Sequence, residues 1–296
     1  MTTRERLDGL YRAFDHVNSA PDPVHVVRRY PLPADREVVG FCAAALAFGR
    51  VASVLQSLEA LLAVMGPHPA AFARDFEPAR DRAGLEGLVH RWISGHDLMA
   101  LVLALRHMLQ ESASIEAFFL QGDDASAPHV GPALESFSSR ALATDLREVY
   151  RRRVKKERRV SYFFPRPSAG SACKRLNLFL RWMVRRDGID LGVWSHVSPA
   201  RLIVPLDTHV IRLGRCLGLT RYVTPGWKMA VDITEALRGF DADDPVRFDF
   251  ALCHAGMMNA CGFLRPQGDS QCPLRGLCHP RGARRYQHRE RIRTRT

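Results

Sequence analysis

The sequence has no long hydrophobic run. No uninterrupted apolar segment reaches the roughly 18 residues that a membrane-spanning helix needs. The first residues, MTTRERLDGLYRAF, carry acidic side chains where a secretory signal has an apolar stretch. The motifs of other enzyme classes are missing too: there is no phosphate loop, no GxGxxG, no GxSxG and no HExxH. These absences predict a cytoplasmic protein with no membrane partner.

Disulfides are not expected either. The chain has 7 cysteines, an odd number, and nothing directs it to an oxidising compartment. Four of these cysteines lie within apolar helical patterns and are expected to be small buried side chains, namely Cys42, Cys173, Cys216 and Cys253.

Strand patterns are almost absent. Apolar residues recur at helical spacing along nearly the whole chain, and only short segments such as LIVP at 202–205 resemble strands. We therefore expect an all-α protein, with helices capped by Asp35, Asp97 and Asp207. Further helices are expected over 54–65, 229–237 and 245–259, with a polar loop near 118–132 and a turn at YFFPRPSAGS. The clearest helix starts at Ser171, and its apolar face comprises Ala172, Leu176, Phe179, Leu180, Met183 and Val184.

Positive charge is concentrated in two segments. The formal net charge is +12, and the segments REVYRRRVKKERR at 147–159 and RGARRYQHRERIRTRT at 281–296 together account for all of it. Clustered Lys and Arg are typical of a surface that binds the phosphates of a nucleic acid. A solvated helix face followed by a disordered tail is the alternative. On the first interpretation the DNA-binding residues include Arg151, Arg152, Arg153, Lys155, Lys156, Arg158 and Arg159.

Two residues, Lys174 and Asp207, combine reactive groups with helix starts. Lys174 lies in the first turn of its helix and points away from the apolar face, a position typical of a surface lysine. A nucleophilic lysine must be neutral, and Arg175, Arg181 and the basic run are positive charges that would lower its pKa. Asp207 caps the next helix, and a rigid carboxylate at that position can also stabilise a cationic sugar. Residue types and spacing alone leave both interpretations open.

The segment PLDTHVIRLGRCLGLT resembles the VDTHV…R…LGL segment of the endonuclease III branch of the helix-hairpin-helix DNA glycosylases. The separation of 33 positions from Lys174 to Asp207 is similar to the spacing in the archaeal oxoguanine glycosylases. The segments AALAFG at 44–49, GSACKRLNLFLRWMVRRDGIDLGVW at 170–194 and DPVRFDFALCHAGM at 244–257 are similar to a bacterial family of unknown function placed near those enzymes. The likeness covers residues 20–280. The LPGVGRKTA-like hairpin is missing, and only Gly170 indicates its tight turn.

The resemblance implies a two-lobed helical fold that binds double-stranded DNA with a damaged base. Lys174 would attack C1′ of a flipped nucleotide across a cavity and form a Schiff base, and Asp207 would assist. Gly170, Arg175 and His209 would contact DNA. Phe48, Trp182 and Trp194 are candidates for base stacking, although core packing is the commoner use of such residues. The expected unit is one two-lobed body over 1–296, with 30–170 mainly the first lobe and 171–280 carrying the Lys, Asp and Cys segments. Residues 281–296 would form a disordered tail.

The C-terminal cysteines partly match the iron–sulfur loop of endonuclease III, C-x6-C-x2-C-x5-C. Cys261 corresponds to the first ligand, and Cys272 and Cys278 correspond to the last two, but Asp269 stands where the second cysteine is expected. We expect a metal-free remnant of the loop. The alternative is a cluster or a zinc ion held by Cys261, Cys272 and Cys278 with Asp269, His254 or His279.

The resulting hypothesis is a monomeric, nucleoid-associated base-excision glycosylase, with possible abasic-site lyase activity and an oxidised purine as the first substrate to consider. A catalytically inactive DNA- or RNA-binding protein with the same fold is the main alternative, and a metalloprotein with a redox or structural role is a third.

Overall fold

The computed structural model describes residues 2–16, 22–150, 160–257, 274 and 276–277. Its fold is mostly helical, as the apolar spacing predicts. The elements that start before residue 100 are α1 (Thr3–Phe14), α2 (Val24–Arg28), α3 (Pro33–Ala45), α4 (Val51–Met65), α5 (Pro69–Arg74), α6 (Pro78–Leu85), β1 (Val89–His90), β2 (Ile93–Ser94) and α7 (Gly95–Ser112). Then follow α8 (Ile115–Leu120), α9 (Gly131–Leu142), η1 (Pro167–Ala169), α11 (Lys174–Val184), η2 (Pro199–Arg201), α12 (Thr208–Cys216), α13 (Trp227–Arg238), η3 (Pro245–Phe248) and α14 (Asp249–Met257).

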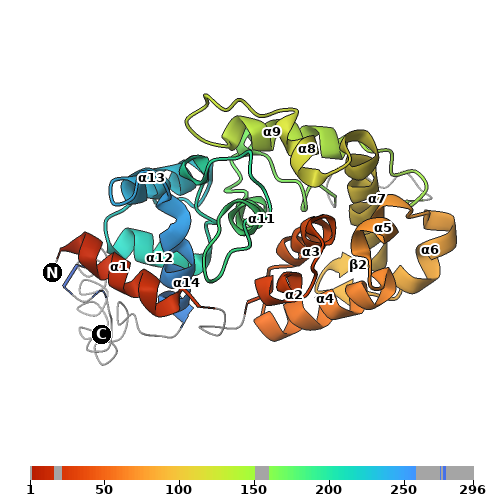
Figure 1. The fold of residues 1–296 in the computed structure, drawn as a ribbon, viewed down its shortest axis with the longest axis horizontal. Coiled ribbons are helices and arrows are strands. Elements are labelled where there is room, and N and C mark those ends of the chain that lie inside the picture. Colours follow the sequence, from red (N-terminus) through yellow and green to blue (C-terminus); the bar gives the residue numbers. More distant parts are fainter. Residues whose placement is uncertain (1, 17–21, 151–159, 258–273, 275, 278–296) are drawn as a thin grey trace, which may run out of the picture.

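The described helices form two groups, with α11 lying between them (Figure 1). One group contains α2 to α9, and the other contains α12, α13 and α14. The N-terminal helix α1 packs against α14 and η3, so the first described residues lie with the second group. The expected division of the chain into 30–170 and 171–280 therefore assigns α1 to neither part, whereas the structure places it with the second group.

Helix α11 is packed tightly against α3 of the first group. A Cβ placed on Gly40 would lie 2.8 Å from Cε of Met183, so the two helices approach as closely as a glycine allows. The rings of Phe41 and Phe179 meet edge to face, with centroids 5.1 Å apart. Because α11 begins at Lys174, this packing fixes the position of the lysine relative to the α3–α4 connection.

Helix capping agrees with the sequence at one of the three expected positions. Asp207 caps α12 and accepts hydrogen bonds from the backbone of His209 and Val210. The expectation for Asp97 is wrong, because Ser94 is the N-cap of α7 and Asp97 is its partner three residues later in a capping box. The expectation for Asp35 is also wrong: α3 starts with Pro33 after Leu32.

Asp35 has a tertiary role instead of a local one. Its side chain is 3% exposed, and Oδ1 accepts a hydrogen bond of 2.8 Å from the backbone N of Ala70 at the start of α5. A buried carboxylate needs such donors. The same side chain therefore satisfies the first turn of a different helix.

Other boundaries shift by a few residues. Helix α11 starts at Lys174 and not at Ser171, because Cys173 takes a left-handed conformation with φ 49°. The segment expected as a loop near 118–132 overlaps the end of α8 at Leu120 and the start of α9 at Gly131. The last expected helix begins as η3 and continues as α14, and residues 258–259 lie outside the described residues.

A short β-hairpin is a structural feature that the sequence pattern did not predict. Strands β1 and β2 pair antiparallel, with His90 opposite Ile93, and leave a two-residue loop of Arg91 and Trp92. Arg91 has φ 54°, a left-handed conformation that costs an L-residue roughly 1–2 kcal/mol. His90 anchors the hairpin, since its ring nitrogens lie 2.9 Å from Oγ of Ser57 and 3.2 Å from the carbonyl oxygen of Phe48.

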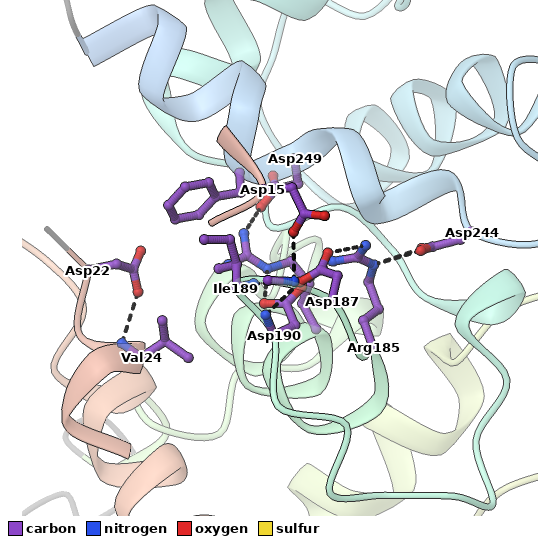
Figure 2. A network of polar contacts seen from close by, with 12 residues as sticks. Asp15, Asp22, Val24, Arg185, Asp187, Ile189, Asp190, Asp244 and Asp249 are labelled. Carbon is purple, nitrogen blue, oxygen red and sulfur yellow. Dashed lines mark hydrogen bonds and ion pairs between the residues drawn. The ribbon is translucent and has the colours of Figure 1, made fainter. Parts of the chain in front are cut away.

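A buried ionic network joins α11, the turn after it, η3 and α14 (Figure 2). Nε of Arg181 lies 3.1 Å from Asp190 and its Nη1 lies 2.5 Å from Asp249. Arg185 forms ion pairs with Asp187, Asp190 and Asp244. All of these side chains except Asp244 are at least nine-tenths buried. The network therefore holds the second group of helices on the end of α11.

No helix among the described residues is both long enough and apolar enough to span a membrane.

Candidate functional site

Asp207 receives three hydrogen-bond donors. Oδ1 accepts from the backbone N of His209 at 2.9 Å and of Val210 at 2.7 Å, which is the geometry of an N-cap. Oδ2 points the other way and accepts from Sγ of Cys253 at 2.9 Å. One carboxylate oxygen therefore caps α12, and the other accepts a hydrogen bond from a side chain of α14. The expected N-cap is confirmed, and the bond to Cys253 is an addition to it.

Cys253 is partly buried on α14, and its surroundings keep the proton on sulfur. Burial raises the pKa of the thiol, and the negative charges of Asp207 and Asp249 raise it further. The positive charge of Lys174 acts in the opposite direction. A protonated thiol is a donor, which agrees with its hydrogen bond to the carboxylate of Asp207.

Lys174 is partly buried at the first position of α11. Its Nζ donates a long hydrogen bond of 3.4 Å to the carbonyl oxygen of Ala47, in the connection between α3 and α4. The side chain therefore bends back toward the first group of helices and does not extend freely into solvent.

The fold thus gathers Lys174, Asp207 and Cys253 from three helices. Asp207 is bonded to the thiol of Cys253, and Lys174 is close enough for its charge to act on the same thiol. None of the three residues lines the cavity of about 1060 Å³ whose lining includes Leu142, Arg147, Phe164 and Ser171. That an opening for a nucleotide separates Lys174 from Asp207 remains a prediction.

Three other predicted DNA-binding residues lie around this cluster. Gly170 ends η1 with φ 78°, so the tight turn is present, and its carbonyl oxygen accepts a hydrogen bond of 3.2 Å from the backbone N of Trp227. Arg175 donates to the carbonyl oxygen of Tyr162, and its guanidinium lies 3.4 Å from the centre of the Tyr162 ring. His209 packs beside Gly256, where an added Cβ would lie 2.7 Å from the Cβ of the histidine.

The structure corrects one expectation about a neighbouring side chain and confirms others. Arg181 is bound in ion pairs with Asp190 and Asp249, so its charge is largely compensated near Lys174. Trp182 and Trp194 are 0% and 3% exposed, and both are core residues. Phe48 is partly buried at the edge of the core. Cys42, Cys173 and Cys216 are buried as expected.

Several predicted residues lie outside the described part of the chain. They are Arg151, Arg152, Arg153, Lys155, Lys156, Arg158 and Arg159 of the basic run, together with Cys261, Asp269, Cys272, Cys278 and His279. Among the described residues, no group of three His, Cys, Asp or Glu side chains is arranged to hold a metal ion. His254 is buried, and its Nδ1 lies 2.9 Å from the carbonyl oxygen of Phe250.

Sequence reasoning missed two residues at this site. Cys253 was expected to be a buried apolar side chain, and only its spacing on α14, four residues after the buried Asp249, hinted at a polar surrounding. Trp92 was not singled out, because the short hairpin that carries it has no periodic pattern. In the structure 58% of its surface is exposed.

Fold and site together define a mostly helical protein in which an aspartate at the start of α12 is bonded to a cysteine of α14, and a lysine of α11 acts electrostatically on the same thiol. Residues 22–258 match the family described as a protein of unknown function, DUF2400, and the chain belongs to this family. The matched range includes α2 to α14 and ends before Cys261, Cys272 and Cys278. No curated protein and no solved structure matches the chain.

Proposed function

We propose that the protein is a DNA glycosylase that removes damaged bases and carries Lys174 as nucleophile and Asp207 as its assisting carboxylate. The observation that carries the proposal is the convergence of these residues, 33 positions apart in the sequence, on the thiol of Cys253. Neither local sequence nor helix capping requires the carboxylate that starts α12 to bond the thiol of Cys253, or a lysine of α11 to lie near enough to influence that thiol.

The proposed reaction begins at the neutral amine of Lys174. Its lone pair forms a bond to C1′ of the sugar while the bond between C1′ and the base breaks, and the base leaves with that electron pair and gains a proton. The amine nitrogen then loses a proton, the C1′–O4′ bond opens, and O4′ is protonated. The product is an iminium, the Schiff base through which an abasic-site lyase acts. A carboxylate at 207 would stabilise the positive charge that develops on the sugar.

The surroundings of Lys174 and Asp207 suit these roles. Asp207 is rigid, because three donors fix its two oxygens. Lys174 is partly withdrawn from water and bonded only weakly to Ala47, so a substrate group can displace that contact. The net charge of +12 favours a polyanionic partner such as duplex DNA. The resemblance to oxoguanine enzymes makes oxidised purines the first substrates to test.

The test is a screen of the purified protein for base release from duplexes that each carry one defined lesion. We expect release from at least one oxidised-purine duplex. Lys174→Gln should abolish it and Asp207→Asn should reduce it by about 100-fold or more, with duplex affinity kept within about threefold in both. Lys228→Gln is the matched control, because Lys228 is an exposed lysine on α13. Salt-sensitive binding with no release from any lesion would instead support the inactive DNA-binding alternative.

A further inference from the structure

The loop between β1 and β2 presents a tryptophan to solvent. Trp92 is 58% exposed, although its neighbour Ile93 is buried in the core. The loop is held in place, because buried His90 ties β1 to α4 through Ser57 and to the carbonyl oxygen of Phe48. An exposed aromatic ring on an anchored two-residue loop has a defined position and is available for contact with another molecule.

Trp92 belongs to a cluster of three aromatic rings. Its ring centre lies 4.6 Å from that of Phe48 and 5.6 Å from that of Tyr162, and the Phe48 and Tyr162 centres are 5.2 Å apart. Phe48 and Tyr162 are partly buried behind it. The cluster therefore supports one face of Trp92, and the exposed surface of the same residue remains accessible.

Two arginines border these rings. The guanidinium of Arg175 lies 3.4 Å from the centre of Tyr162, and that of Arg91 lies 5.1 Å from the centre of Trp92. Arg91 is exposed and adopts φ 54° in the hairpin loop, a conformation that glycine or asparagine would adopt more easily. Exposed aromatic surface flanked by cations is what a nucleic-acid strand requires for base stacking and phosphate contact.

The cluster adjoins the candidate site. Nζ of Lys174 is bonded to the carbonyl oxygen of Ala47, the residue directly before Phe48, and Arg175 directly follows Lys174. A DNA strand that reaches Lys174 therefore passes close to Trp92. The location links the exposed ring to the same ligand that the lysine is proposed to act on.

We propose that Trp92, supported by Phe48 and Tyr162, is a stacking platform for an unpaired nucleobase of DNA, and that Arg91 contacts a phosphate beside it. This inference rests on the proposed function, in that it specifies how DNA lies at the site of Lys174. A fully paired duplex offers no free base face, whereas a duplex with an abasic position leaves the opposite base unpaired. The platform should therefore favour the second duplex.

The test uses the full-length protein and a duplex in which 2-aminopurine lies opposite a tetrahydrofuran abasic analogue, compared with the same duplex fully paired. Wild-type protein should quench 2-aminopurine and bind the abasic duplex more tightly. Trp92→Ala should lose the quenching and about tenfold of that affinity, with little change for the paired duplex. Trp92→Phe, which keeps an aromatic face, should retain most of both.

Val89→Ala is the matched control, since Val89 is 65% exposed on the same hairpin and should leave both affinities unchanged. Melting by circular dichroism checks that the variants fold. Arg91→Ala should lower the slope of log affinity against log salt by about one. The inference is overturned if Trp92→Ala, folded, quenches and binds like the wild type, or loses affinity equally for both duplexes.

The two proposals fail separately. Lys174→Gln should quench 2-aminopurine as the wild type does, because stacking needs no chemistry at the lysine. If neither the wild type nor any variant releases a damaged base, but Trp92→Ala still weakens binding to the abasic duplex, the stacking proposal stands and the glycosylase proposal falls. If the wild type releases a damaged base and Trp92→Ala leaves binding of the unpaired base unchanged, the glycosylase proposal stands and the stacking proposal falls.

Discussion

At the scale of single residues, Asp207 combines a structural task with the proposed chemical one. As an N-cap it contributes about 1 kcal/mol to α12, and asparagine caps a helix nearly as well as aspartate. Asp207→Asn therefore removes the charge while it keeps the cap. This substitution separates the electrostatic role of the carboxylate from its role in folding.

The pairing of Asp207 with Cys253 predicts a change in thiol reactivity. Because the charge and the hydrogen bond of Asp207 raise the pKa of the thiol, Asp207→Asn should lower that pKa. The thiolate is the reactive form, so alkylation of Cys253 by iodoacetamide at pH 8 should become several-fold faster. Peptide-resolved mass spectrometry measures the rate at each cysteine.

Cys42 and Cys216 serve as internal controls, since both are almost completely buried, and their alkylation should stay slow in both proteins. The acidic replacement Asp207→Glu keeps the negative charge and should leave Cys253 slow. An unchanged rate at Cys253 in the asparagine variant would show that the bond between α12 and α14 does not form in solution.

At the scale of elements, the contact between α12 and α14 positions the site. Gly256 on α14 lies against His209 on α12, with room for no side chain: an added Cβ would be 2.7 Å from the histidine Cβ. Arg212 of α12 also donates a hydrogen bond to the carbonyl oxygen of Gly256. These contacts bring Cys253, one turn earlier on α14, to the start of α12.

Gly256→Ala should therefore destabilise the protein although alanine is the better helix former. Alanine gains roughly 1 kcal/mol in helix propensity, but forcing the two helices apart costs roughly 1–3 kcal/mol. Gly9→Ala on α1 is the matched control, because nothing lies within 4 Å of an added Cβ there. Urea unfolding should show a lower stability for the first variant and an equal or higher one for the second. Greater stability of Gly256→Ala would contradict the tight contact.

The elements also show what the sequence alone could predict. The N-cap of α12 was predictable, because a capping aspartate acts within its own first turn. The roles of Asp35 and Cys253 were not, because their partners, Ala70 and Asp207, lie 35 and 46 residues away and meet them only after the helices pack. The sequence predicted the start of α11 three residues too early, because no local sequence pattern indicates the left-handed conformation of Cys173.

The candidate site was predicted in part for the same reason. Lys174 and Asp207 were identified by resemblance to a known enzyme family, and their helix-start positions were visible in the pattern. The hairpin with Trp92 was missed, because strands of two residues carry no alternation of polar and apolar side chains. The exposed ring of Trp92 lies near Lys174 only because the α3–α4 connection packs against both the hairpin and α11, and the sequence pattern does not indicate that packing.

At the scale of the whole molecule, the buried ionic network connects α1, near the amino terminus, with α11, η3 and α14. Asp187 follows α11 and accepts a hydrogen bond of 3.2 Å from Tyr11 of α1. It also pairs with Arg185 at 2.7 Å, and its other oxygen accepts from the backbone N of Ile189 and Asp190. Lys174 and Cys253 of the proposed site lie on α11 and α14, two of the helices that this network joins.

Stability should consequently depend on pH through Asp187. Burial alone would raise the pKa of this carboxyl, but the charge of Arg185 and the backbone donors outweigh it and lower the pKa. Because its pKa is lower in the folded protein than in the unfolded chain, ionised Asp187 stabilises the fold at any pH above the ordinary carboxyl pKa near 4. This stabilisation is lost as the pH falls through the lower pKa of the folded protein. Asp187→Asn should lower the unfolding free energy by about 2 kcal/mol at pH 7, and the gap should shrink below about pH 4.

Glu59→Gln is the control for this measurement, because the ion pair of Glu59 with Arg29 is exposed on both sides and should contribute about 0.5 kcal/mol or less. Urea unfolding of the three proteins between pH 3 and pH 7 gives the comparison. A gap for Asp187→Asn that is constant across this range would contradict the ionic role.

The most direct measurement of the central claim is borohydride trapping with peptide mapping. The chain has four lysines, Lys155, Lys156, Lys174 and Lys228, so a reduced Schiff base can be assigned to one residue by mass spectrometry. On duplexes with an oxidised purine or an abasic site, we predict a covalent DNA adduct on the Lys174 peptide, present in Lys228→Gln and absent in Lys174→Gln. No adduct on any duplex, or an adduct confined to another lysine or the amino terminus, would contradict the account.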